Sequence, residues 1–413
     1  MSSNSSRGSL LNRRLIIFLA AMVFAELSRT MTMIQIPVYL RELGASIQQI
    51  GFFFTISLAF PLLLRIFGGW LSDTVGRLPA LIVGSAIGVL TFIAYILAPS
   101  WQIALLGPAI LAISSALIFP SYKSYIADHA IEEVRGRAFG IAEAVVTSAW
   151  IIGPPIGGYF AQNFGYRLMF LAAAVTFGIA MMVFFFLHRT APSEEKFTGQ
   201  KPDLTNLRVS FRQMFLLIIS GGLVTWILIV DGVRDIAFKM SFDLMPIYLN
   251  EIALFSKQEI GYLDGLFGIA LAATTIPAGW LADKSSERVG ITLGIFTMII
   301  SRLVFAISLS FTGFAFSWML LGVGGGLLDP AGSALIAKGI PKRMRGLAYG
   351  LIATSLGIFS LPAPWIGSQV WNYVNPRAPF LLSVVLGMIV IIPAWKKLVF
   401  KPKHWVGVEV TLP

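Results

Sequence analysis

The chain has 413 residues, of which 56% are hydrophobic and only 12% are charged. Soluble domains carry about 25% charged residues, so this composition excludes a soluble globular protein. The apolar runs are continuous over roughly 20 residues, the length of a membrane-spanning helix, whereas barrel strands alternate polar and apolar residues. The sequence therefore predicts an all-α polytopic membrane protein that contacts the lipid bilayer.

The composition gives no support to several classes of function. The chain has no cysteine, which excludes disulfides, thiol catalysis and cysteine-ligated zinc. Its three histidines fall at the ends of predicted helices, away from any cluster suited to catalysis or metal binding. The phosphate-binding loop motif of ATP-driven pumps is missing from the sequence. We therefore predict no enzyme, no catalytic residue, no cofactor and no metal site.

Apolar runs, separated by charged or turn-forming segments, predict twelve transmembrane helices in chain order. They lie near 15–40, 47–70, 79–98, 101–126, 137–161, 166–188, 213–249, 257–281, 289–309, 313–338, 346–371 and 378–397. The seventh run is too long for one straight span, and we expect part of its first third in the membrane interface.

The basic residues lie mostly on one side of these spans. With the N-terminus inside, 21 of the 31 Lys and Arg residues fall on the cytoplasmic side, four on the opposite side and six within spans. Short cytoplasmic loops carry such an excess of positive charge. We therefore expect both termini in the cytoplasm, and the net charge of +11 to reflect topology and contact with anionic lipid rather than a nucleic-acid partner.

The chain is predicted to divide into two pseudo-symmetric six-helix halves. These are residues 15–188 and 213–397, joined by a cytoplasmic linker at 189–212 and flanked by cytoplasmic tails at 1–14 and 398–413. The halves align at an offset of 210 residues: "QIG" at 49–51 matches "EIG" at 259–261, and "RGRAFG" at 135–140 matches "RGLAYG" at 345–350. Duplicated halves of this kind are typical of secondary transporters, with a site between the halves near the bilayer midplane.

Residues 68–77, "GGWLSDTVGR", follow the second span directly. They resemble the signature of the major facilitator superfamily between helices two and three, in which Gly69, Asp73, Gly76 and Arg77 match. Two basic positions of the signature are replaced, by threonine at 74 and leucine at 78. The resemblance, which covers essentially the whole chain, implies a twelve-helix transporter and identifies this segment as a gating loop.

The resemblance also implies partners for the gating loop. Asp73 is expected to cap a helix end of the opposite half, and Arg77 to pair with Asp128 at the end of the fourth helix. A weaker copy of the segment, "AGWLADKSSER" at 278–288, keeps Asp283 but lacks the glycine. We expect the contacts that this second segment makes to be weaker than those of residues 68–77.

A second motif, "GPPIGG" at 153–158, lies in the predicted fifth helix. Gly157 and Gly158 would allow close helix approach, while Pro154 and its neighbour bend the span. With Gly153 it resembles the helix-five motif of superfamily exporters that work as proton antiporters, especially multidrug ones. The fourth helix departs from that pattern, since "LLGPAILAISS" lacks the arginine of many proton antiporters.

Charged residues inside spans cost several kcal/mol and therefore predict function. Glu26 and Arg29 lie near the middle of the first span, on one helix face. The seventh span carries four further charges in the same region: Asp231, Arg234, Asp235 and Lys239. By resemblance to the superfamily, helices one, four, seven and ten line the cavity, which adds Asp329 from helix ten. We expect Glu26 or Asp235 to take up and release a proton, with the basic residues tuning it or contacting an anionic group.

Aromatic and methionine residues are less informative. Trp150 and Trp226 could stack on a flat substrate, but packing between helices is the simpler interpretation of each. The 14 methionines, including Met31 and Met33 beside the charged pair, suit an adaptable apolar pocket.

These features together predict a secondary active transporter with alternating access. The leading hypothesis is proton-coupled efflux of small amphiphilic compounds by a monomer in the plasma membrane. The alternative is proton-coupled uptake or exchange of a small anion, sugar or other metabolite, for which the intramembrane basic residues argue. A receptor that binds a ligand without transporting it remains a third, weaker hypothesis.

Overall fold

The structure, a computed structural model, describes residues 13–129, 135–190, 222–284, 286–339 and 345–399. The predicted linker beyond residue 190 and nearly all of both predicted tails lie outside these residues. All regular secondary structure in the described part of the chain is helical, as predicted.

The first half contains α1 (Arg13–Met33), α2 (Ile36–Glu42), α3 (Ile47–Val75), α4 (Arg77–Leu97), α5 (Trp101–Ala104), α6 (Leu106–His129), α7 (Arg135–Asn163) and α8 (Gly165–Arg189). The second half contains α10 (Leu223–Phe242), α11 (Met245–Ile247), the π-helical turn η3 (Tyr248–Ile252), α12 (Lys257–Lys284), α13 (Glu287–Ile307), α14 (Phe311–Gly339), α15 (Arg345–Ser360), α16 (Ala363–Tyr373) and α17 (Ala378–Lys397).

Ten helices in the described residues are long and apolar enough to cross a membrane by themselves. The two remaining spans are the seventh and the eleventh. The seventh, α10, carries four charged residues within 20 positions, which lowers its hydropathy. The eleventh is divided into α15, of 16 residues, and α16, of 11 residues. The charges of α10 and the break between α15 and α16 explain why neither span is counted among the ten. The described helices therefore agree with the predicted twelve spans.

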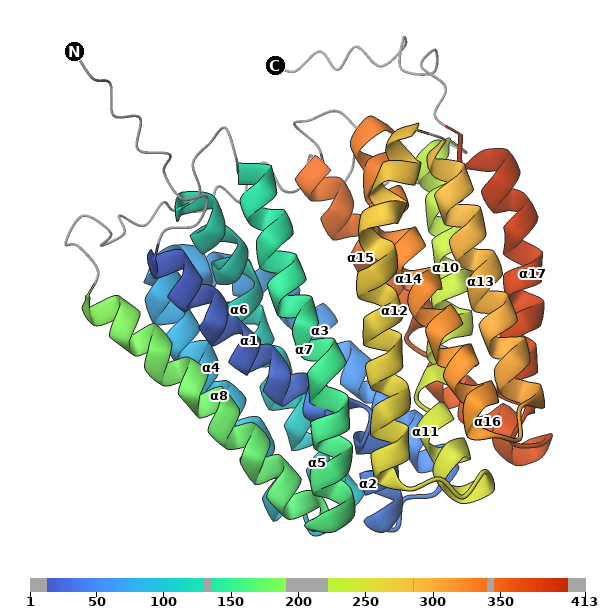
Figure 1. Cartoon of the computed structure of the whole chain (residues 1–413), viewed down its shortest axis with the longest axis horizontal. Helices are drawn as coiled ribbons and strands as arrows, with labels where there is room; N and C mark the ends of the chain where they lie inside the picture. The colour runs from blue at the N-terminus through green and yellow to red at the C-terminus, as the bar shows by residue number, and fades with distance from the viewer. Residues whose placement is uncertain (1–12, 130–134, 191–221, 285, 340–344, 400–413) are drawn as a thin grey trace.

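Figure 1 shows two groups of helices side by side, one from each half of the chain. The first helix, α1, begins and the last, α17, ends at the same end of the bundle, which we call the terminal end. The opposite end, where α2, α5, α11 and α16 lie, is the distal end. The two groups converge toward the distal end and diverge toward the terminal end.

Three predicted spans are broken near the distal end, among them the seventh, which was expected to be too long for one straight helix. The span predicted at 15–40 bends between α1 and α2, where Pro37 occupies the first turn of α2. The span predicted at 213–249 begins in the described residues at Leu223 and breaks before Pro246 in α11. The eleventh breaks at Pro362 before α16. Proline lacks the N–H of an ordinary residue and clashes with the preceding turn, so each helix restarts there.

The repeat is visible in how the two halves meet. A Cβ built on Gly261 of α12 would collide with the Pro154 carbonyl of α7, and one on Gly51 of α3 would lie 2.7 Å from the Pro364 carbonyl of α16. Both the glycines and the prolines are 210 positions apart. The same close helix crossing therefore occurs twice, once on each side of the interface between the halves.

The α7–α12 crossing is tight from the distal end to mid-helix. A Cβ on Gly158 would lie 2.6 Å from the Lys257 carbonyl, and one on Gly268 would lie 2.5 Å from the Trp150 carbonyl. Nearer the terminal end, a Cβ on Gly140 of α7 or Gly279 of α12 would meet no atom within 4 Å. This glycine series agrees with the divergence of the halves in Figure 1.

Charged and polar side chains close the distal end between the halves. The Arg41 guanidinium forms an ion pair with Glu251, and Lys257 Nζ lies 2.5 Å from Glu42 Oε1. The Gln35 side chain donates a hydrogen bond of 2.9 Å to the Lys257 carbonyl. These contacts join α2 and its N-cap residue Gln35 to η3 and α12, so the two halves are held together at this end.

Candidate functional site

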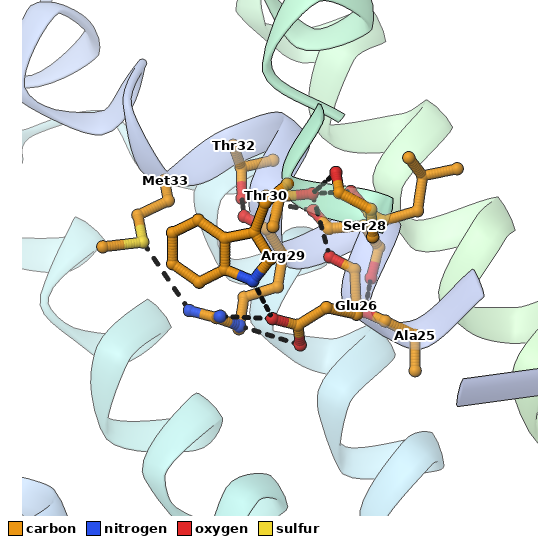
Figure 2. A network of polar contacts seen from close by, with 10 residues as sticks. Ala25, Glu26, Ser28, Arg29, Thr30, Thr32 and Met33 are labelled. Atoms are coloured by element: carbon orange, nitrogen blue, oxygen red, sulfur yellow. Dashed lines mark hydrogen bonds and ion pairs between the residues drawn. The ribbon is translucent and has the colours of Figure 1, made fainter. Parts of the chain in front are cut away.

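The Glu26–Arg29 pair of α1 is the centre of the first polar cluster. Arg29 Nε donates to Glu26 Oε2 at 3.1 Å, and Arg29 Nη2 contacts the other carboxylate oxygen, so the pair is bidentate. The Arg29 side chain is 26% exposed and that of Glu26 is 13% exposed. Figure 2 shows the guanidinium between Glu26 and the thioether of Met33, 3.6 Å away. A helical spacing of three residues places both groups on one face, as predicted.

Trp150 of α7 completes this cluster, which corrects its interpretation as a packing residue alone. Its indole Nε1 donates a hydrogen bond of 3.0 Å to Glu26 Oε1, and the Arg29 guanidinium lies 4.9 Å from the ring centroid. The ring also packs 6.2 Å from Phe267 of α12, across the interface between the halves. The acid is thereby hydrogen-bonded to α7, one of the two helices that form the tight crossing between the halves.

A second cluster lies on α10, at a similar distance along its helix. Asp235 Oδ2 lies 2.8 Å from Lys239 Nζ, and Asp231 Oδ1 lies 3.4 Å from Arg234 Nη2. Lys239 also donates a 2.8 Å hydrogen bond to Ser360 Oγ of α15, a contact that the sequence offered no signal for. Asp235 lies 209 positions after Glu26, one less than the repeat offset of 210, so the two acid–base pairs occupy nearly equivalent places in the two halves.

Asp329 belongs to the second cluster. It lies on α14 within electrostatic range of Arg234 and Asp231. The structure thus brings together the residues predicted on helices seven and ten. It keeps them on a different group of helices from Glu26 and Arg29, so the predicted site consists of one cluster in each half.

The segment expected to be a gating loop is helical for most of its length, which corrects that prediction. The third helix continues through Gly69 and Asp73 to Val75, and only Gly76 separates it from α4. Gly76 has φ = 95°, a conformation that favours glycine over residues with a side chain. Asp283 likewise lies in the last turn of α12. The side chains of Asp73 and Asp283 lie outside the described residues, so the capping role remains a prediction.

The predicted partner of the segment is in place at the terminal end. Arg77 Nε lies 3.6 Å from Asp128 Oδ2, joining the start of α4 to the end of α6. In the second half, Lys338 of α14 forms an ion pair with Glu287 of α13. Lys338 lies 210 positions after Asp128, and Glu287 lies 210 positions after Arg77, so the acid and the base have exchanged places. The second half therefore has an ion pair at the equivalent place, although its copy of the segment matches the signature less well.

The helix-five glycines serve close packing on two sides of α7. A Cβ on Gly153 or Gly157 would collide with Thr30 or Met31 of α1, whereas Gly158 faces α12. Thr30 Oγ1 also donates a 2.9 Å hydrogen bond to the Ala149 carbonyl of α7. The motif positions α1, and with it Glu26, against the helix that crosses into the other half.

Replacing Gly157 by alanine should destabilise the protein by about 1–3 kcal/mol or more, because the new methyl would overlap the Met31 carbonyl, which no rotamer change can relieve. Gly140→Ala on the same helix is the matched control, since its Cβ would meet no atom within 4 Å. Thermal unfolding of the purified protein in detergent measures both. Equal midpoints for the two variants would contradict the close approach.

The profile of the Major Facilitator Superfamily matches residues 18–254 and again residues 233–410. The chain belongs to the Major Facilitator Superfamily. As a member of this superfamily it is a multi-pass membrane transporter and not an enzyme. The family and the fold predicted from the sequence are thereby confirmed.

Among the superfamily relatives, a multi-drug resistance efflux pump PmrA homolog of Lactococcus lactis is 26% identical over 392 residues, or 91% of this chain and 93% of the relative. Multidrug resistance protein 2 of Bacillus subtilis is 23% identical and covers 94% of this chain and 95% of the relative. Both relatives align over nearly their full length.

Solved structures share the fold. A POT family transporter in complex with 5-aminolevulinic acid superimposes with a TM-score of 0.73 at 14% identity, covering 92% of this chain and 94% of that chain. The human organic anion transporter MFSD10 gives 0.65 at 14% identity, covering 92% and 99%. At these identities the likeness concerns the fold alone.

Proposed function

We propose that this protein is a proton-coupled exporter of small amphiphilic compounds, acting as a monomer in the plasma membrane. The observation that carries the efflux proposal is the full-length similarity to multidrug efflux pumps. The observation that supports proton coupling is the ionisable pair Glu26–Arg29 inside a span, hydrogen-bonded to the helix that crosses between the halves.

We assign the terminal end to the cytoplasm, with both chain termini inside, on the bias of basic residues. The halves are joined by ion pairs at the distal end and diverge at the terminal end. In this assignment the conformation is inward-facing, the state in which an exporter takes up its cargo from the cytoplasm or the inner leaflet.

Coupling follows from the contacts of Glu26. Protonation cancels the charge that holds Arg29 and weakens the hydrogen bond from Trp150. Trp150 is then free to repack against Phe267, so the protonation state biases the α7–α12 crossing. The Asp235–Lys239 pair occupies the equivalent depth in the second half and is the second candidate for the same role.

The second candidate function is uptake or exchange of a small anion or sugar. It is favoured by the three basic residues at mid-depth, Arg29, Arg234 and Lys239, whose side chains are 22–26% exposed and can reach a ligand. Arginine recognises carboxylate or phosphate groups through a bidentate fork.

The test uses purified protein in liposomes with an imposed pH gradient, with ethidium and tetraphenylphosphonium as amphiphilic probes. We expect transport of at least one probe above protein-free liposomes, and nigericin, which collapses the gradient, should reduce it to the protein-free rate. Undiminished transport with nigericin would refute proton coupling. Transport of lactate or glucose, with neither probe moved, would favour uptake or exchange over efflux.

A further inference from the structure

Arg302 of α13 is a buried charge. The residue is only 4% exposed, and no carboxylate lies within ion-pair distance in the described part of the chain. Its Nη1 contacts the Met245 sulfur at 2.8 Å, the Phe238 ring lies 5.5 Å away, and Nη2 has no hydrogen-bond partner among the residues that the structure describes. Burying an unpaired charge is costly, so a counter-charge is expected.

A cavity of about 30 Å³ lies beside this guanidinium, between α10, α13, α14 and α17. Its polar lining consists of Arg302, Arg234 and Ser383, and the rest is apolar. Arg234 is already paired with Asp231, and the Ser383 hydroxyl donates to the Ala237 carbonyl at 2.7 Å. Among the described residues, one uncompensated positive charge therefore remains at a space large enough to hold a guest at least the size of a water molecule.

The equivalent place in the first half is filled without a charge. Position 92, which lies 210 residues before Arg302, is a buried phenylalanine that packs 6.0 Å from Phe177. Position 387, which lies 210 residues after Phe177, is a glycine lining the cavity. The first half thus fills its bundle with two aromatic rings where the second half has a guanidinium and an open space.

We propose that this cavity is a binding site for one small monovalent inorganic anion, such as chloride, held by Arg302. The charge balance calls for one negative charge, the volume admits an ion of about the size of a water molecule, and the apolar lining suits a weakly hydrated anion. The site lies within the second half and does not depend on the proton coupling proposed above.

The test compares the thermal midpoint of purified protein in sodium chloride and in sodium gluconate at equal ionic strength. Chloride should raise the wild-type midpoint by about 2 °C or more, with saturation, because a ligand that binds only the folded state stabilises it. Arg302→Gln should lose this chloride-dependent part, and radiolabelled chloride should bind wild type at one site per chain and not the variant. Arg288→Gln on the same helix, whose guanidinium stacks on Trp395, is the matched control and should keep the shift.

A second variant keeps the proposal testable if Arg302→Gln fails to fold. Arg302→Met removes the charge and puts a flexible, unbranched apolar side chain in its place, so it should fold and show no chloride dependence. Equal wild-type midpoints in the two salts with no saturable chloride binding would overturn the proposal. A chloride shift that persists in either Arg302 variant would overturn it as well.

Discussion

Replacing Glu26 by glutamine should reduce pH-driven transport about tenfold or more while leaving substrate exchange without a gradient intact. Glutamine cannot carry the proton, but its side-chain oxygen can replace Oε1 and still accept from Trp150 Nε1 and Arg29 Nη2, with only the bond from Arg29 Nε to Oε2 lost. The fold of the cluster should therefore survive while coupling is lost. The measurement is probe transport in liposomes with and without a pH gradient, followed by counterflow.

Two controls separate coupling from stability. Glu259→Gln alters an acid at the start of α12 that accepts from the Ser256 backbone at 2.9 Å, and it should retain gradient-driven transport. Glu26→Ala removes the acceptor as well, and it should lower the free energy of unfolding by about 1–3 kcal/mol because Arg29 and Trp150 lose their partner. Full gradient-driven transport by Glu26→Gln would rule out Glu26 as the proton carrier and leave Asp235 to be tested by Asp235→Asn.

A cross-link at the distal end should stop transport completely and reversibly. Gln48 of α3 donates a 3.1 Å hydrogen bond to Gln369 of α16, so these side chains meet across the interface between the halves. The natural chain has no cysteine, so Gln48→Cys with Gln369→Cys introduces the only thiols. A bifunctional methanethiosulfonate reagent, which spans the gap left by the two glutamine side chains, should join the thiols, fix the distal end closed and reduce transport to the protein-free rate, and dithiothreitol should restore it.

The matched control joins two helices of the same half. Ser301 Oγ of α13 lies 3.3 Å from Ser317 Oγ of α14, and a disulfide between Ser301→Cys and Ser317→Cys should leave transport nearly unchanged. Rigid-body movement of one half against the other predicts this difference. Undiminished transport in a fully cross-linked Gln48→Cys and Gln369→Cys protein would show that the distal end does not open.

Much of the candidate site could be predicted from local sequence. Glu26 with Arg29 and Asp235 with Lys239 are pairs within one helix, and helical spacing alone places such side chains together. Trp150 and Ser360 could not be found this way, because they come from other helices and their positions depend on packing. The same holds for Arg302: the sequence shows an arginine in a span, and only the packed bundle shows that no carboxylate in the described residues reaches it.

Local sequence was enough to identify the class of protein, the twelve spans, the two halves and the family. Hydrophobic length, the charge bias and a constant repeat offset are properties of the chain that need no tertiary contact to read. Three features became visible only in the packed bundle: where the spans break, which end of the bundle is closed, and that residues 68–77 are mostly helical. Those outcomes depend on steric fit between distant residues, such as Gly261 against Pro154, and on the pairing of charges from different helices, which sequence spacing does not specify.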